Sequence, residues 1–291
     1  MILLSYYSDN SISYAIKIDN QLYTITTLNS VLNKKYPTDI ESLLKSGSFY
    51  ELKEWFDEIG KAKIVESVPP FNPDQINYAP LYLHPGKIWG IGLNYKEHAA
   101  DLDEVTPEDE PASFMKPYTA IIGHGDEIEI PLQSEKTTAE AELGIIIGKC
   151  CKEVECENWL DMVAGFTTII DMTAEDILRK NPRFLTRSKS FDTFFSFGPA
   201  LVTPDEIENL IDLKVSTIIN DKVHASNIIR NMTFPPDYLV SFHSKVMTML
   251  PGDIISSGTP GAVHINHGDK VECRIEGFET LINTVIDLKK I

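Results

Sequence analysis

Residues 139–149, Ala-Glu-Ala-Glu-Leu-Gly-Ile-Ile-Ile-Gly-Lys, follow the apolar pattern of a buried strand, which Glu140 and Glu142 interrupt. Side chains two positions apart in a strand point to the same face, so both carboxylates would lie together. Two like charges beside an apolar run repel each other and lose hydration, so we expect a cationic group to compensate them. The alternative is that the pair forms a solvated edge.

A third acid, Asp171, ends a second apolar run at 165–171. If the two strands lie side by side, Glu140, Glu142 and Asp171 converge on one point. Oxygen ligands without a nearby Cys or His suit Mg2+, Mn2+ or Ca2+, and they disfavour zinc and copper. The spacing alone leaves both a metal site and a solvated acidic edge open.

The chain has 291 residues, 43% of them hydrophobic, and a formal net charge of −17, as in a soluble globular protein. This charge argues against nucleic acid or an anionic membrane as the principal partner, because both bind basic surfaces. No run reaches the roughly 18 apolar residues of a membrane helix. The opening residues 1–4 lack the basic flank of a signal peptide, so we expect a cytoplasmic protein.

The composition of the chain changes near residue 80, after a proline-rich stretch typical of a stiff connector. Residues 1–80 predict a small N-terminal α/β domain, in which an antiparallel meander precedes helices. Its expected elements are strands at 3–8, 13–18 and 22–25, a helix with a capping box at 38–41, and an amphipathic helix at 49–59 that Gly60 ends.

Residues 81–291 predict a second domain, in which short β-rich runs alternate with Pro and Gly turns. The expected strands are 87–92, 120–123, 128–130, 143–148, 165–171, 213–219, 253–256, 269–275 and 281–288, and the expected helices are 95–102, 174–179 and 237–247. Many strands with few crossovers indicate a barrel or folded-over sheet rather than a doubly wound one. The predicted fold class is therefore α+β and β-rich.

Several separated motifs carry a resemblance to a known family. They include Trp89-Gly90-Ile91-Gly92-Leu93-Asn94-Tyr95, Phe114-Met115-Lys116-Pro117, Glu140-Ala141-Glu142-Leu143, Ser188-Lys189-Ser190-Phe191-Asp192 and Ser257-Gly258-Thr259-Pro260-Gly261. In this order, from about residue 80 to the end, they resemble the fumarylacetoacetate hydrolase family. The small N-terminal domain is similar to that of the short-form members, such as acylpyruvases, oxaloacetate decarboxylases and hydroxyheptadienedioate isomerases.

The resemblance implies a C-terminal β-roll, a homodimer and a divalent cation, Mg2+ with Mn2+ or Ca2+ as alternatives, held by Glu140, Glu142 and Asp171. A small-molecule 2-oxo acid would chelate the ion through its carboxylate and keto oxygens. The resemblance also implies that Lys189 adds a second positive charge beside the enolate oxygen. Without the family, Lys189 would be interpreted as an exposed partner of Asp192.

His98 and Asp101 are three positions apart, so on a helix they share a face and the acid could orient the imidazole toward a water molecule. In the family this segment resembles a lid with a His and commonly a Glu, and here the Glu position holds Asp101. A second departure is Ile170, where relatives usually carry Asn before the metal-binding Asp. These departures put the substrate in question more than the reaction class.

The remaining candidates for substrate binding are Lys116, Gly258, Thr259 and Arg230. The turn at 258–261 could aim backbone N–H groups and the Thr259 hydroxyl at a carboxylate, or it could simply connect two strands. Arg230 could bind a distal carboxylate, or it could face solvent.

The leading hypothesis is a metal-dependent enzyme that acts on a 2-oxo or 2,4-dioxo acid through an enolate, by C–C bond hydrolysis or decarboxylation. One alternative is an enol–keto isomerase or hydratase of a hydroxydienoic diacid. Two others are a non-catalytic 2-oxo-acid binding protein and a purely structural β-rich module.

Overall fold

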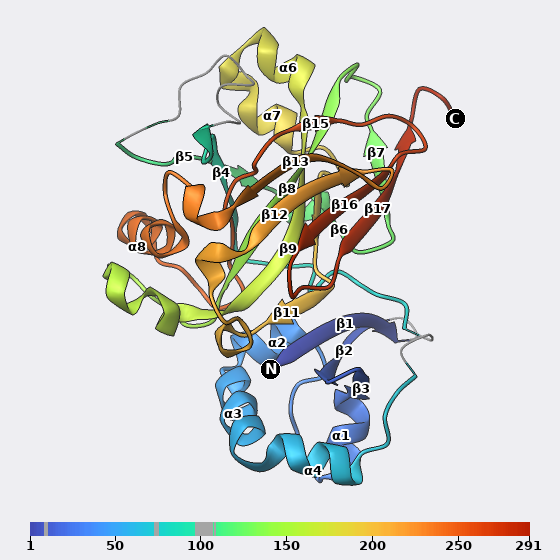
Figure 1. The fold of residues 1–291 in the computed structure, drawn as a ribbon, viewed down its shortest axis with the longest axis vertical. Helices are drawn as coiled ribbons and strands as arrows, with labels where there is room; N and C mark the ends of the chain where they lie inside the picture. Colours follow the sequence, from blue (N-terminus) through green and yellow to red (C-terminus); the bar gives the residue numbers. More distant parts are fainter. Residues whose placement is uncertain (9–10, 73–75, 97–106, 108) are drawn as a thin grey trace.

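The computed structural model describes residues 1–8, 11–72, 76–96, 107 and 109–291. Two β-sheets form its centre, and a group of N-terminal helices lies at one end of them (Figure 1). The structure is α+β with mixed sheets, as the sequence predicts.

Strand β8 lies inside the larger sheet, which contains twelve strands among the described residues. The hydrogen-bonded order is β3-β2-β1-β11-β9-β8-β14-β4-β5, while β10 pairs with β6 and β9, and β15 pairs with β8. The bounds of these strands are β1 Ile2–Ser8, β2 Ser11–Ile18, β3 Gln21–Thr24, β4 Ile88–Gly92, β5 Ala112–Lys116, β6 Ile121–Ile122, β8 Thr137–Ile147, β9 Val163–Ala174, β10 Phe195–Phe197, β11 Ala200–Val202, β14 Ile254–Ser256 and β15 Val263–His264.

The smaller sheet covers one face of β8. Its order is β13-β12-β16-β17-β7, with β7 Glu127–Ile130, β12 Lys214–Ile219, β13 Lys222–Ile228, β16 Lys270–Ile275 and β17 Leu281–Asp287. Strands β12 and β16 lie against β8, and the Ala141 N–H donates to Thr217 Oγ1 at 3.0 Å. Every residue of β8 is buried, which explains its nearly continuous apolar sequence.

The helices are short and lie around the two sheets (Figure 1). The α-helices are α1 Ile25–Val31, α2 Ile40–Lys45, α3 Ser48–Trp55, α4 Lys61–Ser67, α6 Glu175–Lys180, α7 Leu185–Lys189 and α8 Pro236–Val246. The π-helical turn η1 spans Phe56–Gly60, and the 3-10 turns are η3 Tyr118–Ala120, η4 Cys156–Met162, η5 Pro182–Phe184, η6 Pro204–Glu206, η7 Leu210–Asp212 and η8 Ile229–Asn231. Among the described residues, no helix is long and apolar enough to cross a membrane.

The prediction that Gly60 ends a helix is wrong, because the chain stays helical from α3 through η1 into α4. Gly60 has ordinary helical dihedral angles, with φ −66° and ψ −43°. A Cβ at this position would lie 2.7 Å from the side chain of Trp55. The glycine therefore allows a close approach of the Trp55 indole instead of stopping the helix.

The predicted antiparallel meander is confirmed, since β2 pairs with β1 and with β3. Strand β1 also pairs with β11, so the N-terminal strands extend the larger sheet. The domain boundary near residue 80 stays a prediction.

Helices α6 and α8 match the predicted helices at 174–179 and 237–247. Strand β8 begins at Thr137, six residues before its predicted start, because the carboxylates interrupt the apolar pattern there. Strands β5, β10, β11, β13 and β15 and helices α1, α4 and α7 were not predicted. The helix expected at 95–102 lies almost entirely outside the described residues.

Candidate active site

Strands β8 and β9 bring the three carboxylates together. Their antiparallel register places Glu140 directly opposite Asp171, and Glu142 opposite Ile169. Carboxylate oxygens of Glu140, Glu142 and Asp171 lie within 4.8 Å of one another, and all three residues are buried. The convergence expected from the sequence is therefore present, and it lies in the interior instead of at a solvated edge.

Two lysines supply the cationic compensation. Lys189, at the end of α7, donates from Nζ to Glu140 Oε2 at 3.0 Å and to Asp171 Oδ2 at 2.5 Å. Lys116, at the end of β5, donates to Asp171 Oδ1 and to the Met172 carbonyl oxygen at 3.1 Å. Both ammonium groups are buried with the acids. This environment does not support an exposed Lys189 that pairs with Asp192.

The two lysines differ in the balance between burial and neighbouring charge. Burial lowers the pKa of Lys116 to about 8, against the opposing charge of Asp171. Burial also acts to lower the pKa of Lys189, but the nearby charges of Asp171 and Glu140 outweigh it and raise this pKa. Lys189 is therefore the more firmly charged of the two.

Glu142 is held from the β14 side of the sheet. Ser256 Oγ donates to Glu142 Oε2 at 2.5 Å, and the Gly258 N–H donates to the same oxygen at 2.8 Å. Burial raises the pKa of Glu142 to about 8, and the charge of Asp171 acts in the same direction. A bound cation would favour the ionised form of this carboxyl group.

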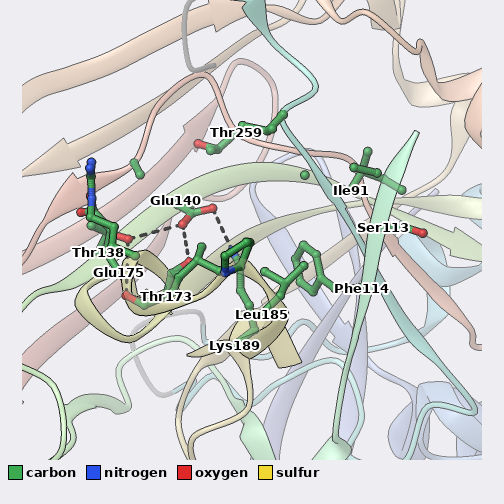
Figure 2. Close-up of a pocket in the computed structure, with 17 residues that line it drawn as sticks. Ile91, Ser113, Phe114, Thr138, Glu140, Thr173, Glu175, Leu185, Lys189 and Thr259 are labelled. Atoms are coloured by element: carbon green, nitrogen blue, oxygen red, sulfur yellow. Dashed lines mark hydrogen bonds and ion pairs between the residues drawn. The ribbon is translucent and has the colours of Figure 1, made fainter. Parts of the chain in front are cut away.

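Glu140 is oriented by two hydroxyl groups. Thr173 Oγ1 donates to Glu140 Oε1 at 2.5 Å, and Thr138 Oγ1 approaches the same oxygen at 3.4 Å (Figure 2). The sequence analysis did not identify either threonine. Thr138 lies two residues before Glu140, and Thr173 lies two residues after Asp171. Because alternate residues of a strand share a face, this spacing could have identified both threonines.

The Gly258 turn is fixed by Asn94. Gly258 has φ +95°, and a Cβ there would lie 2.7 Å from Asn94 Cβ. The Asn94 side chain donates to the carbonyl oxygens of Phe234 at 2.9 Å and Ser257 at 2.8 Å. Within the turn, Thr259 Oγ1 donates to the Gly261 carbonyl oxygen at 3.1 Å. The Gly258 N–H thus orients Glu142, while Thr259 lines the adjoining cavity.

A cavity of about 500 Å³ opens beside Glu140. In Figure 2, Thr138 and Glu175 lie on one side of Glu140, and Lys189 and Phe114 lie on the other. The cavity is lined by Ile91, Gly92, Leu93, Ala112, Ser113, Phe114, Thr138, Glu140, Thr173, Glu175, Leu178, Arg179, Pro182, Leu185, Lys189, Thr259 and Ala262. It is large enough for a small organic acid, and its walls are mostly apolar away from the carboxylates.

One residue predicted from the sequence, Arg230, is not brought into this group. Arg230 is a surface residue, 52% exposed at its side chain, and forms an ion pair with Asp212. It is absent from the cavity lining in the part of the chain that the structure describes. His98 and Asp101 lie outside the described residues.

A β-rich α+β fold that buries two glutamates and an aspartate beside a cavity defines a class of acidic sites suited to a divalent cation. The family description Fumarylacetoacetate (FAA) hydrolase C-terminal matches residues 87–286, and the chain belongs to this enzyme family. Residues of the candidate site from Lys116 to Thr259 lie within the matched segment.

Individual proteins are similar to the chain over most of its length. The chain is 41% identical over 207 residues to an uncharacterised protein of Archaeoglobus fulgidus, covering 71% of this chain and 81% of the relative. It is 32% identical over 247 residues to the mitochondrial oxaloacetate tautomerase FAHD2A of Homo sapiens, covering 82% and 78%. The solved 5-carboxymethyl-2-hydroxymuconate delta-isomerase of Mycobacterium smegmatis has a TM-score of 0.76 and 27% identity, covering 99% of each chain.

Proposed function

We propose that the protein is a divalent-metal-dependent enzyme that acts on a 2-oxo or 2,4-dioxo acid through an enolate. The observation that carries this proposal is the buried triad of Glu140, Glu142 and Asp171, with oxygens within 4.8 Å of one another. A ligand set of carboxylate oxygens favours Mg2+, with Mn2+ and Ca2+ as alternatives. Membership of an enzyme family supports catalysis over a purely structural role.

The charge balance of the site fits a cation and an anionic substrate. With every group ionised, three carboxylates and the ammonium groups of Lys116 and Lys189 give one net negative charge in the interior. A divalent cation would change this to one net positive charge, which complements the carboxylate of a 2-oxo acid. When bound, the cation supplies positive charge to the substrate's carboxylate and keto oxygens and so favours enolate formation next to the keto group.

Individual residues would divide the remaining tasks. Lys189 lines the cavity and would place a second positive charge near the developing enolate. The Thr259 hydroxyl would turn away from the Gly261 carbonyl oxygen and donate its one proton to the substrate carboxylate. Lys116 would hold Asp171, and the Gly258 N–H would hold Glu142, so that both carboxylates keep their orientation.

Three reactions could share the enolate: C–C bond hydrolysis, decarboxylation and enol–keto tautomerisation. The human relative's name favours tautomerisation of a short 2-oxo diacid, and the Mycobacterium smegmatis structure is also that of an isomerase. Tautomerisation needs proton transfer alone, whereas hydrolysis also needs an activated water, for which His98 and Asp101 are the candidates from the sequence. We therefore propose tautomerisation first and hydrolysis or decarboxylation second.

A comparison of three assays tests this proposal. Protein stripped of metal would be reloaded with Mg2+ or Mn2+ and given enol-form oxaloacetate, keto-form oxaloacetate and acetylpyruvate. Decay of the enol, release of carbon dioxide and hydrolysis of acetylpyruvate would distinguish the reactions. Activity that survives complete chelation would reject the metal mechanism. Metal-dependent binding of oxalate without turnover of any substrate would favour a non-catalytic binding protein.

We also propose that the protein is a homodimer, as the family resemblance implies. Light scattering during size-exclusion chromatography measures the mass directly. A mass equal to that of the single 32.7 kDa chain at all concentrations would reject the dimer.

A further inference from the structure

We infer that Arg179 selects substrates that carry a second carboxylate at the end distant from the 2-oxo acid group. This inference rests on the proposed function and specifies which 2-oxo acids the cavity prefers. It comes from an ion cluster on α6 that the catalytic proposal does not use.

The cluster consists of one buried carboxylate and two exposed cations. Glu175 Oε1 accepts from Arg179 Nε at 2.5 Å, and Glu175 Oε2 lies 2.8 Å from Lys136 Nζ. The Glu175 side chain is 8% exposed, whereas those of Arg179 and Lys136 are 54% and 46% exposed. Because one carboxylate faces two cations, the cluster carries one surplus positive charge.

Only one of the two cations faces the cavity. Glu175 and Arg179 both line it, and Lys136 is absent from the lining in the described part of the chain. Each Glu175 oxygen already has a cationic partner, Arg179 or Lys136, so this carboxylate holds Arg179 in place. The surplus charge is therefore available to a ligand through the Arg179 guanidinium group.

The guanidinium group has donors left for a ligand. Its Nε–H is used by Glu175, and among the described residues no partner is recorded for its two terminal amino groups. Two parallel N–H donors match the two oxygens of a carboxylate. Since Glu175 fixes the Nε edge, the opposite edge is partly preorganised to bind such a group.

The rest of the cavity lining offers few other partners for a second carboxylate. Leu178, Pro182 and Leu185 form apolar parts of the wall on the α6 and α7 side. The other cation among the described lining residues is Lys189, which already bonds to Glu140 and Asp171. A carboxylate buried without a partner costs several kcal/mol, so a diacid that enters this cavity should bind where Arg179 can reach it.

The cluster is also displaced from the metal-binding carboxylates along one strand. Asp171 and Thr173 are on β9, and Glu175 follows at the first position of α6. Four residues of extended chain span roughly 13 Å, so the two ends of a ligand would contact separate groups. The 2-oxo acid end would lie at the triad, and the distal carboxylate would lie toward α6.

Pairs of ligands that differ only in the second carboxylate test this inference. Binding of 2-oxoglutarate and 2-oxopentanoate to the Mn2+-loaded protein would be measured by calorimetry, with oxalate as the ligand that reaches only the triad. We expect Arg179→Ala to weaken 2-oxoglutarate binding by about 10- to 100-fold, the typical effect of losing a charge-assisted pair. Binding of oxalate and 2-oxopentanoate should change by less than about 2-fold.

Lys136→Ala is the matched control, because it removes one positive charge beside Glu175, as Arg179→Ala does, without altering the cavity lining. It should keep the preference for the diacid over the monoacid within about 3-fold of the unmodified protein. Arg179→Lys should retain part of the preference, because it keeps the charge and loses the paired donors.

Different results distinguish failure of this inference from failure of the proposed function. Equal weakening of monoacid and diacid in Arg179→Ala would overturn the role of Arg179, as would an equal loss of preference in Lys136→Ala. An unmodified protein that binds oxalate but does not prefer the diacid would overturn it as well. An unmodified protein that binds neither oxalate nor any 2-oxo acid with Mn2+ would reject the proposed function itself.

Discussion

Glu140 and Asp171 stand directly opposite each other on β8 and β9, and the Lys189 ammonium group bridges them at 3.0 and 2.5 Å. All three groups are buried, so each depends on the others for its charged state. This relationship connects the stability of the two central strands to the chemistry of the site.

The first prediction concerns this bridge. Lys189→Met should lower the free energy of unfolding of the metal-free protein by about 3 to 5 kcal/mol, because it removes one of the two buried cations that compensate the three carboxylates and leaves Lys116 alone to do so. Adding Mn2+ should recover part of this loss, since the ion compensates the same charges. Urea denaturation with and without Mn2+ measures both effects. A destabilisation that Mn2+ does not reduce would contradict a metal-binding role for these carboxylates.

The second prediction concerns the orientation of Glu142. Ser256→Ala removes the hydroxyl that donates to Glu142 Oε2, and it should weaken Mn2+ binding by about 10- to 100-fold. Ser216→Ala is the control, because the Ser216 hydroxyl bonds instead to Ser226 in the smaller sheet. Calorimetric titration of both variants with Mn2+ gives the comparison. Equal affinities for the two variants would show that Ser256 does not support a metal ligand.

The third prediction concerns His98, which lies outside the described residues. If hydrolysis is a reaction of this enzyme, His98→Ala should reduce kcat by about 10²- to 10⁴-fold, the usual contribution of a general base. Mn2+ affinity should stay unchanged, because the proposed ligands are Glu140, Glu142 and Asp171. Turnover of acetylpyruvate and titration with Mn2+ measure the two quantities separately. Unchanged turnover would remove His98 from the mechanism.

The three carboxylates of the candidate site were predictable because their chemistry is visible in the local sequence. Two carboxylates at alternate positions of an apolar strand need compensation wherever the strand lies, and Asp171 ends a similar run. The family resemblance implied a place for Lys189 beside the enolate oxygen, but its bonds to Glu140 and Asp171 were not expected, because α7 approaches β8 through the tertiary fold. The contact of Lys116 with Asp171 also depends on how β5 lies relative to β9, which no local pattern contains.

The interpretation of Gly60 and Arg230 shows where local patterns lose information. Gly60 was interpreted as a helix end, but its lack of a side chain serves the packing of Trp55. Arg230 was considered for a distal carboxylate, whereas its structural partner is Asp212 on the surface. Arg179 was not considered, because nothing in its local sequence indicates that α6 borders the cavity. The role of a residue that is set by its tertiary neighbours could therefore not be predicted from the sequence alone.

The fourth prediction concerns the turn at Gly258. Gly258→Ala should lower the free energy of unfolding by about 2 to 4 kcal/mol, because it combines an unfavourable positive φ with a contact of 2.7 Å to Asn94 Cβ. Gly252→Ala is the matched control, since Gly252 has φ +87° and nothing within 4 Å of its Cβ position. It should cost about 1 kcal/mol, from the positive φ alone. Equal losses in urea denaturation would contradict the close approach to Asn94.

The last prediction concerns the pH dependence of stability. His243 is 1% exposed, neither ring nitrogen has a hydrogen-bond partner among the described residues, and burial lowers its pKa to about 4. Between pH 6.5 and 4 the unfolded chain therefore binds a proton at this residue that the folded protein does not. The resulting stability is fully present above pH 6.5 and falls as the pH decreases, by about 3 kcal/mol in total. His243→Leu should remove this part of the decrease, while the exposed control His224→Leu should retain it. Urea denaturation between pH 7.5 and 4.5 gives the two slopes, and identical slopes would show that His243 is protonated without cost in the folded protein.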